Sequence, residues 1–267
     1  GFFLVAMFGV ICIHAGTNLA NDYFDHRSGA DELNREHTVF SGGSRVIQEK
    51  TLGARSILLG ALFFFALGGL TGLFLVWARG WPLLAIGIIG IASGYFYTAT
   101  PFKLGYRGWG ELLTGLNCGP LVVLGAYYVQ AREFSWQALV AAVPVGILVA
   151  AILYVNEFSD HDADKSAGKA HLVVRLGPRR AVKGIYLLFL GAYVAVAAGC
   201  LAAAIPWPGL AALLTAPLAW WAARSASANW ASGSGEKMTP AMAGTIVTHL
   251  ATGLLLAGGY LAAGAMR

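Results

Sequence analysis

Charged side chains are scarce in this sequence. Only 12% of its 267 residues are charged, about half the fraction typical of a soluble domain, whereas 57% are hydrophobic. The mean hydropathy of +0.65 agrees with this balance. The deficit excludes an ordinary water-soluble globular domain. The net charge of +5 comes from the connections between apolar segments, so it gives no indication of nucleic acid binding.

Cysteine is also scarce, and recognisable calcium loops are lacking. The three cysteines, Cys12, Cys118 and Cys200, are isolated within apolar segments, which excludes a cysteine metal site and a disulfide framework. The run "DHDAD", which begins at Asp160, resembles the start of an EF-hand. It fails as one because Lys165 stands where the calcium loop needs glycine.

Long apolar segments are what the sequence has in abundance. They recur eight times, at about 1–20, 54–78, 82–99, 112–130, 136–157, 181–204, 206–223 and 241–265. These lengths suit helices that cross a hydrocarbon layer of about 30 Å. Backbone groups in lipid must be satisfied within the segment, and the segments are too long for barrel strands. We therefore predict an all-α, polytopic transmembrane helical bundle.

Lysine and arginine are unevenly distributed between the connections. If the eight segments alternate in direction, fifteen of the eighteen basic residues follow the first, third, fifth and seventh segments. The positive-inside rule places this side in the cytoplasm. We expect an integral, multi-pass protein of a bacterial or archaeal cell membrane, in contact with membrane lipid.

Acidic residues gather on the same side, in two stretches. Twelve of the thirteen lie there, mainly in "NLANDYFDHRSGAD" (18–31) and "NEFSDHDADKSAGK" (156–169). Helical spacing places an asparagine and two aspartates of each stretch on one helix face. These are Asn18, Asp22 and Asp25 in the first stretch and Asn156, Asp160 and Asp164 in the second. Because both stretches follow odd-numbered segments, the two faces can meet.

Four converging aspartates repel one another unless cations lie between them. Hard carboxylate oxygens favour Mg²⁺, which completes its coordination with water and substrate phosphate oxygens. The nearby connections also carry basic residues suited to phosphate, namely Arg45, Lys103, Arg107 and Lys169. This mixture of carboxylates and basic residues predicts a magnesium-diphosphate active site on the cytoplasmic side of the membrane. A cation or phosphate transporter, whose charges would lie near the bilayer midplane, is the alternative from a different class.

The two acidic stretches resemble the aspartate-rich motifs of the UbiA superfamily of intramembrane prenyltransferases. The first is most similar to the MenA-like branch, in the form N-x-x-N-D-Y-x-D-x-x-x-G-x-D. The matching residues are Asn18, Asn21, Asp22, Tyr23, Asp25, Gly29 and Asp31. Two positions depart from the broader superfamily pattern, because Gly29 and Asn156 stand where that pattern has aspartate.

The resemblance implies a single prenyltransferase domain over 1–267. Members of the superfamily have nine transmembrane helices with the motifs after helices two and six, so the eight segments here imply that the first helix is missing. The implied reaction is the transfer of a polyprenyl group from its diphosphate to an aromatic acceptor. In the MenA-like branch this acceptor is 1,4-dihydroxy-2-naphthoate, in menaquinone biosynthesis. The same-class alternatives are 4-hydroxybenzoate, a chlorophyllide or a glycerol phosphate lipid.

The resemblance also assigns roles to residues of this sequence. Two Mg²⁺ ions that bridge to the diphosphate would be held by the four catalytic residues Asp22, Asp25, Asp160 and Asp164. Contacts to the diphosphate would come from Asn18, Asn21, Arg45, Lys103, Arg107, Asn156 and Lys169. Aromatic side chains that could shield a prenyl cation from water are Phe63, Phe64, Phe65, Tyr95, Phe96 and Tyr97. Four histidines near the stretches have no assignable partner, and one of them could serve as a base, namely His26, His37, His161 or His171.

Overall fold

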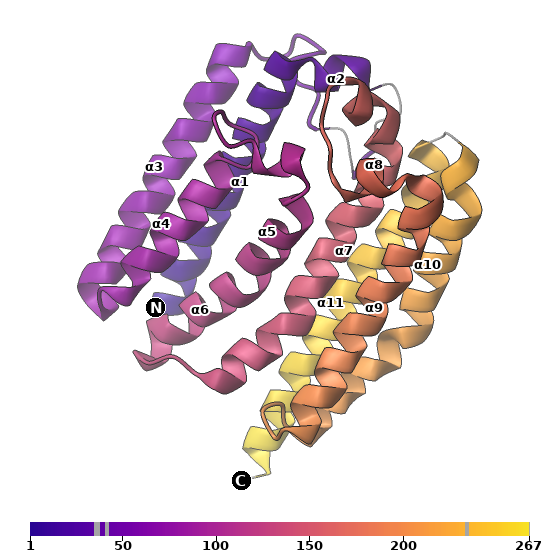
Figure 1. The fold of residues 1–267 in the computed structure, drawn as a ribbon. Helices are drawn as coiled ribbons and strands as arrows, with labels where there is room; N and C mark the ends of the chain where they lie inside the picture. Colours follow the sequence, from indigo (N-terminus) through magenta and orange to yellow (C-terminus); the bar gives the residue numbers. More distant parts are fainter. Residues whose placement is uncertain (35–37, 41–42, 233–234, 267) are drawn as a thin grey trace.

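The computed structural model describes residues 1–34, 38–40, 43–232 and 235–266, and within them the regular elements are all helical (Figure 1). In chain order they are α1 (Phe2–Ser28), α2 (Ala30–Leu33), α3 (Ala54–Arg79), α4 (Pro82–Tyr95), η1 (Leu104–Arg107), α5 (Gly110–Leu116), η2 (Asn117–Leu121), α6 (Val122–Ala131), α7 (Trp136–Ser166), α8 (Leu172–Leu176), α9 (Pro178–Leu201), η3 (Trp207–Thr215), α10 (Ala216–Asn229), η4 (Trp230–Ser232) and α11 (Gly235–Ala265). The prediction of an all-α, multi-pass membrane protein is confirmed.

Each of the eight predicted segments lies on helical structure, and six of them lie on helices long and apolar enough to span a membrane. One of the six is continuous from Gly110 to Ala131, with a π-helical turn, η2, around Pro120. The segment 82–99 is shorter than predicted, because α4 ends at Tyr95. The segment 206–223 begins as the 3-10 helix η3 and continues as α10.

Most of each acidic stretch is helical, although the apolar segment before it ends earlier in the sequence. Helix α1 was expected to end near residue 20 but continues to Ser28, and α7 continues to Ser166. Gly29 then ends α1 in the left-handed conformation, with φ of 83°, which glycine adopts without steric cost. The aspartates therefore project from the last turns of two rigid helices rather than from loops.

The helices form two groups with a space between them (Figure 1). Helices α3 and α4 pack on α1, whereas α9 and α11 pack on α7. The continuous helix α5–α6 joins the groups, and it approaches α7 closely. A Cβ atom on Gly119 would lie 2.5 Å from the Cα of Gly146, so this crossing needs glycine. Helices α2 and α8 lie at one end of the bundle, and both chain termini lie toward the other.

Candidate active site

A cavity of about 640 Å³ lies between α1, α3, α4, the α5–α6 helix and α7. Its wall follows α1 from Phe3 to Asp25, which corresponds to about 33 Å at the helical rise of 1.5 Å per residue. Toward the chain termini the lining is apolar and includes Met7, Leu75 and Val129. The opposite end carries the acidic stretches. The cavity is thus a long apolar channel that opens into a polar pocket.

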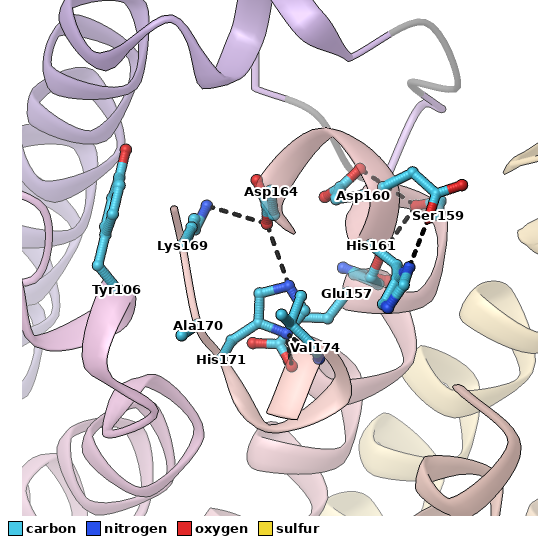
Figure 2. A network of polar contacts seen from close by, with 12 residues as sticks. Tyr106, Glu157, Ser159, Asp160, His161, Asp164, Lys169, Ala170, His171 and Val174 are labelled. Atoms are coloured by element: carbon cyan, nitrogen blue, oxygen red, sulfur yellow. Dashed lines mark hydrogen bonds and ion pairs between the residues drawn. The ribbon is translucent and has the colours of Figure 1, made fainter. Parts of the chain in front are cut away.

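Lys169 connects the two acidic stretches across this pocket. Its Nζ lies 3.2 Å from Asp25 Oδ2 of the first stretch. It also lies 3.4 Å from Asp164 Oδ2 of the second stretch (Figure 2). Burial opposes the charge on Lys169, but these two carboxylates outweigh it and hold its pKa well above the usual range. Tyr106 supports the arrangement by donating to Asp25 Oδ1 at 2.7 Å. The structure thereby brings together the two faces that the sequence placed on one side.

A second polar cluster lies beside Lys169. His171 Nε2 is 3.2 Å from Asp164 Oδ2, and its Nδ1 is 3.3 Å from Glu157 Oε2 (Figure 2). Burial alone would lower the pKa of His171, yet its contacts with Asp164 and Glu157 raise it to about 9. Glu111 of α5 completes the cluster and accepts a hydrogen bond from the Leu172 N–H at 2.7 Å. The ligand atoms of Glu111, Glu157 and His171 lie within 4.8 Å of one another, close enough to hold a metal ion.

Described residues of the connection between α1 and α3 contact the acidic end. Ser44 donates to both carboxylate oxygens of Asp22, at 3.2 Å from its N–H and 2.5 Å from its hydroxyl. Asn34 donates to Asp160 Oδ1 at 2.9 Å. Arg45 holds this connection in place by donating to the Asp31 and Asn34 carbonyl oxygens. Two of the four predicted metal ligands are therefore hydrogen-bonded to one loop.

The structure places most of the predicted site residues on the cavity wall. The lining includes Asn18, Asn21, Asp25, Asn156, Asp160, Asp164 and Lys169. Asp22 is buried against Ser44 rather than on the wall. The structure does not bring the three other basic residues to the wall: Arg45 binds the loop, Arg107 donates to the Pro101 carbonyl oxygen, and Lys103 lies 5.0 Å from the centre of the Tyr106 ring.

Several residues of the polar pocket received no site role from the sequence. Asp31, Asn34 and Glu157 line it, and His171 and Glu111 support it. Burial, reinforced by the nearby carboxylates of Asp25 and Asp22, raises the pKa of Asp31 to about 8. Glu157 had a signal, because it lies three and seven residues before Asp160 and Asp164, on the same helix face.

Two looser expectations also have outcomes. Of the six aromatic residues considered as shields, Tyr97 lines the cavity, whereas the Phe63 side chain faces outward and is 61% exposed. Of the four histidines without an assigned partner, His171 joins the polar cluster. His37 lies outside the described residues.

Fold and site together define an integral membrane protein with a cavity that joins a charged, polar pocket to an apolar channel. The chain belongs to the UbiA prenyltransferase family, because the sequence model of that family matches residues 1–245. It is therefore a membrane-embedded prenyltransferase.

Named relatives are similar over most of the chain. A 2-carboxy-1,4-naphthoquinone phytyltransferase of Synechocystis is 33% identical over 97% of this chain and 81% of the relative. A 1,4-dihydroxy-2-naphthoate octaprenyltransferase of Mycobacterium tuberculosis is 34% identical over 96% of this chain and 83% of the relative. The enzyme of the same name from Bacillus subtilis is 32% identical over 77% of this chain and 65% of the relative. No solved structure matches significantly.

Proposed function

We propose that this protein transfers a polyprenyl group from polyprenyl diphosphate to 1,4-dihydroxy-2-naphthoate, as a Mg²⁺-dependent step of menaquinone biosynthesis. The observation that carries this proposal is the junction of an aspartate-rich, lysine-bridged pocket with an apolar channel, within one cavity about 33 Å long. The names of the similar proteins from Synechocystis and Mycobacterium tuberculosis support a naphthoate-type acceptor. We assign the activity to one transmembrane domain over 1–267.

The donor atoms of the pocket fit magnesium. They are almost all carboxylate and amide oxygens, the ligands that hard cations prefer. Two of the amide oxygens, Asn21 Oδ1 and Asn156 Oδ1, are buried without a hydrogen-bond partner in the described structure, and both residues line the cavity. The proposed ligands of two Mg²⁺ ions are Asp22, Asp25, Asp160 and Asp164. Bound magnesium would neutralise the charge that develops on the departing diphosphate.

The protein's own side chains would orient the diphosphate. In our proposal Lys169 donates a charge-assisted hydrogen bond to a phosphate oxygen. The amides of Asn18, Asn21 and Asn156 donate further hydrogen bonds from the cavity wall. Positive charge from the surrounding connections would come from Arg45, Lys103 and Arg107. Of these, Lys103 lies over the ring of Tyr106, whose hydroxyl donates to Asp25.

The apolar part of the cavity would receive the polyprenyl tail from the lipid and exclude water from the reacting carbon. Tyr97, which lines the cavity, is the aromatic side chain proposed to shield that carbon. The basic residues concentrate around the polar end, so we propose that this end faces the cytoplasm, in a bacterial or archaeal cell membrane.

The decisive experiment supplies purified protein in lipid nanodiscs with labelled polyprenyl diphosphate and a panel of acceptors. The panel contains dihydroxynaphthoate, 4-hydroxybenzoate, a chlorophyllide and a glycerol phosphate lipid. We expect prenylated naphthoquinol only with the first acceptor, and loss of product when EDTA replaces Mg²⁺. Preference for another acceptor would contradict the naphthoate assignment. Ion uptake into vesicles without any prenylated product would instead favour a transporter.

A further inference from the structure

Glu157 is a carboxylate on the cavity wall to which the diphosphate pocket gives no role. It lies on α7 one helical turn deeper in the bundle than Asp160, a rise of about 4.5 Å. In that direction the only further lining residues of α7 within the described structure are the adjacent Asn156 and then Leu153, at the start of the apolar channel. Glu157 therefore marks the boundary between the polar pocket and the channel.

The surroundings of Glu157 leave it short of hydrogen-bond donors. Its side chain is 6% exposed, and its Oε2, 3.3 Å from His171 Nδ1, has no hydrogen bond within the described structure. Glu111 adds a second buried carboxylate to the same cluster. One imidazole thus faces two glutamates, and it is shared with Asp164. A buried carboxylate with unfilled acceptor capacity favours a ligand that donates a hydrogen bond.

The reaction geometry places the acceptor ring at this same level. The prenyl carbon that reacts is bonded directly to the diphosphate, and reacting atoms must come within about 3–3.5 Å of each other. The acceptor ring must therefore lie next to the pocket, on its channel side. Two polar groups from other helices line the cavity on this channel side. Tyr97, after α4, lies beside Glu111, because its hydroxyl is 2.7 Å from a Cβ placed on Gly110. Asn117 of η2 lies about 9 Å further along the α5–α6 helix than Glu111 and accepts a hydrogen bond from Ser93 at 2.9 Å. Polar side chains at membrane depth usually serve function.

We propose that Glu157, Tyr97 and Asn117 form the subsite for a phenolic acceptor, and that Glu157 is the catalytic base for its ring hydroxyl. The assignment rests on the proposed prenyl transfer. The hydroxyl O–H bond breaks and its proton goes to the Glu157 carboxylate, while the freed electron pair moves into the ring. The ring carbon that bears the carboxylate bonds to the prenyl carbon, and the prenyl C–O bond breaks with its electrons leaving on the diphosphate.

The same residue can complete the reaction. The ring oxygen is now a ketone beside a carbon that carries a carboxylate, an arrangement from which carbon dioxide departs readily. Its C–C electron pair restores the aromatic ring, and Glu157 returns the proton to the ring oxygen. No oxidant or reductant is consumed, and the base is regenerated.

This role is tested by combining a substitution at Glu157 with methylation of the acceptor hydroxyl and comparing the turnover of each combination. We expect Glu157→Gln to lower the turnover of dihydroxynaphthoate by about 100-fold, within the usual range for a general base. Its affinity for polyprenyl diphosphate should change by less than about twofold, because that ligand lies among the aspartates. In the wild type, methylating the reacting hydroxyl of the acceptor should lower turnover by about the same factor as the substitution does. In the variant, methylating that hydroxyl should lower turnover little further.

Glu111→Gln is the matched control, because Glu111 shares the buried cluster without lining the cavity. It should retain the full discrimination between hydroxyl and methyl ether. If methylation reduces turnover by the same factor in Glu157→Gln as in the wild type, Glu157 does not contact that hydroxyl and the inference is wrong. A wild type that prenylates no phenolic acceptor would overturn the proposed function, and the inference with it.

Cys118 gives a test that needs no variant. It lines the cavity next to Asn117, whereas Cys12 and Cys200 do not line it. We expect saturating dihydroxynaphthoate to protect Cys118 from N-ethylmaleimide, measured by peptide mass spectrometry, with the other two cysteines as internal references. Equal labelling of Cys118 with and without the acceptor would place the acceptor elsewhere.

Discussion

Lys169 is the residue on which the polar pocket depends electrostatically. It contacts Asp25 and Asp164, which come from opposite sides of the cavity and would otherwise repel each other. Its side chain is 16% exposed, so water screens these contacts only weakly. An ammonium group in this position keeps the two acidic helix ends together before any metal or diphosphate arrives.

Replacing Lys169 with methionine should expose this role. The change leaves two buried carboxylates without their cation, and we expect a loss of about 3 kcal/mol in the free energy of unfolding without metal. Magnesium should stabilise the variant more than the wild type, because it replaces the missing charge. Thermal unfolding in detergent, with EDTA or with Mg²⁺, measures both effects. Lys165→Met is the control, since Lys165 is exposed near the same helix end; an equal loss there would refute the role.

His171 and Asp31 predict how stability depends on pH. The pKa of His171 is raised from its ordinary 6.5 to about 9, so its contribution is complete below pH 6.5 and is lost as the pH rises through 9. The pKa of Asp31 is raised to about 8 by burial, so its ionisation also destabilises the fold as the pH rises. We therefore expect the melting temperature in EDTA to fall between pH 6.5 and 9. His171→Asn should flatten this fall, and an unchanged slope would exclude His171 as its source.

The crossing of the α5–α6 helix over α7 is the element that places Glu111 beside Glu157. Gly115 and Gly119 of one helix face Gly146 of the other, and a Cβ on Gly115 would lie 2.9 Å from the Gly146 carbonyl oxygen. The contact joins backbone to backbone, so neither side can yield by changing a rotamer. The buried cluster of two glutamates and a histidine follows from this close approach.

Gly119→Val should separate the two helices. The new side chain meets the backbone of Gly146, and overpacking of this kind destabilises by about 1–3 kcal/mol. We expect a lower melting temperature together with reduced acceptor prenylation. Gly253→Val on α11 is the matched control, because a Cβ there meets no atom within 4 Å. Equal effects of the two substitutions would show that the crossing is not special.

Elements with long apolar runs could be predicted from the sequence, and their polar ends could not. The eight segments were found because membrane spans need a minimum length of apolar residues. The predicted segments ended before α1 and α7 do, because the last turns of these helices are polar and face a polar cavity rather than lipid. Glu111 was not recognised for a related reason. It stands alone at the start of an apolar segment, and its neighbours are Glu157 of α7, His171, and the Leu172 N–H at the start of α8.

At the scale of the whole molecule, the site is a cavity that runs the length of the bundle rather than a pocket at one end. The aspartates from α1 and α7 could be paired from helix parity alone, whereas the channel arises from how α1, α3, α4, the α5–α6 helix and α7 pack. Its walls contain glycines that leave space. A Cβ on Gly72 of α3 or on Gly87 of α4 would meet no atom within 4 Å, and both residues line the cavity.

The absence of a side chain at Gly72 should allow the channel to accept long polyprenyl groups. Its neighbour Thr71 lies 3.1 Å from a Cβ placed on Gly9, so Gly72 lies near the level of Gly9. That level is about 24 Å along α1 from Asp25. A phenylalanine at position 72 would fill the far part of the channel and leave the polar pocket intact. We expect Gly72→Phe to turn over geranyl diphosphate within about threefold of the wild type, but long-chain donors at least about tenfold more slowly, a barrier of about 1.4 kcal/mol.

Competition between short and long donors in one reaction, with products separated by chain length, measures this shift directly. Gly191→Phe on α9 is the matched control, because its Cβ would also meet no atom within 4 Å but the residue does not line the cavity. Equal loss for all donors in Gly72→Phe would indicate a damaged fold. An unchanged preference would mean that the tail follows another path, because a filled channel at this depth has no room for a chain that extends beyond it.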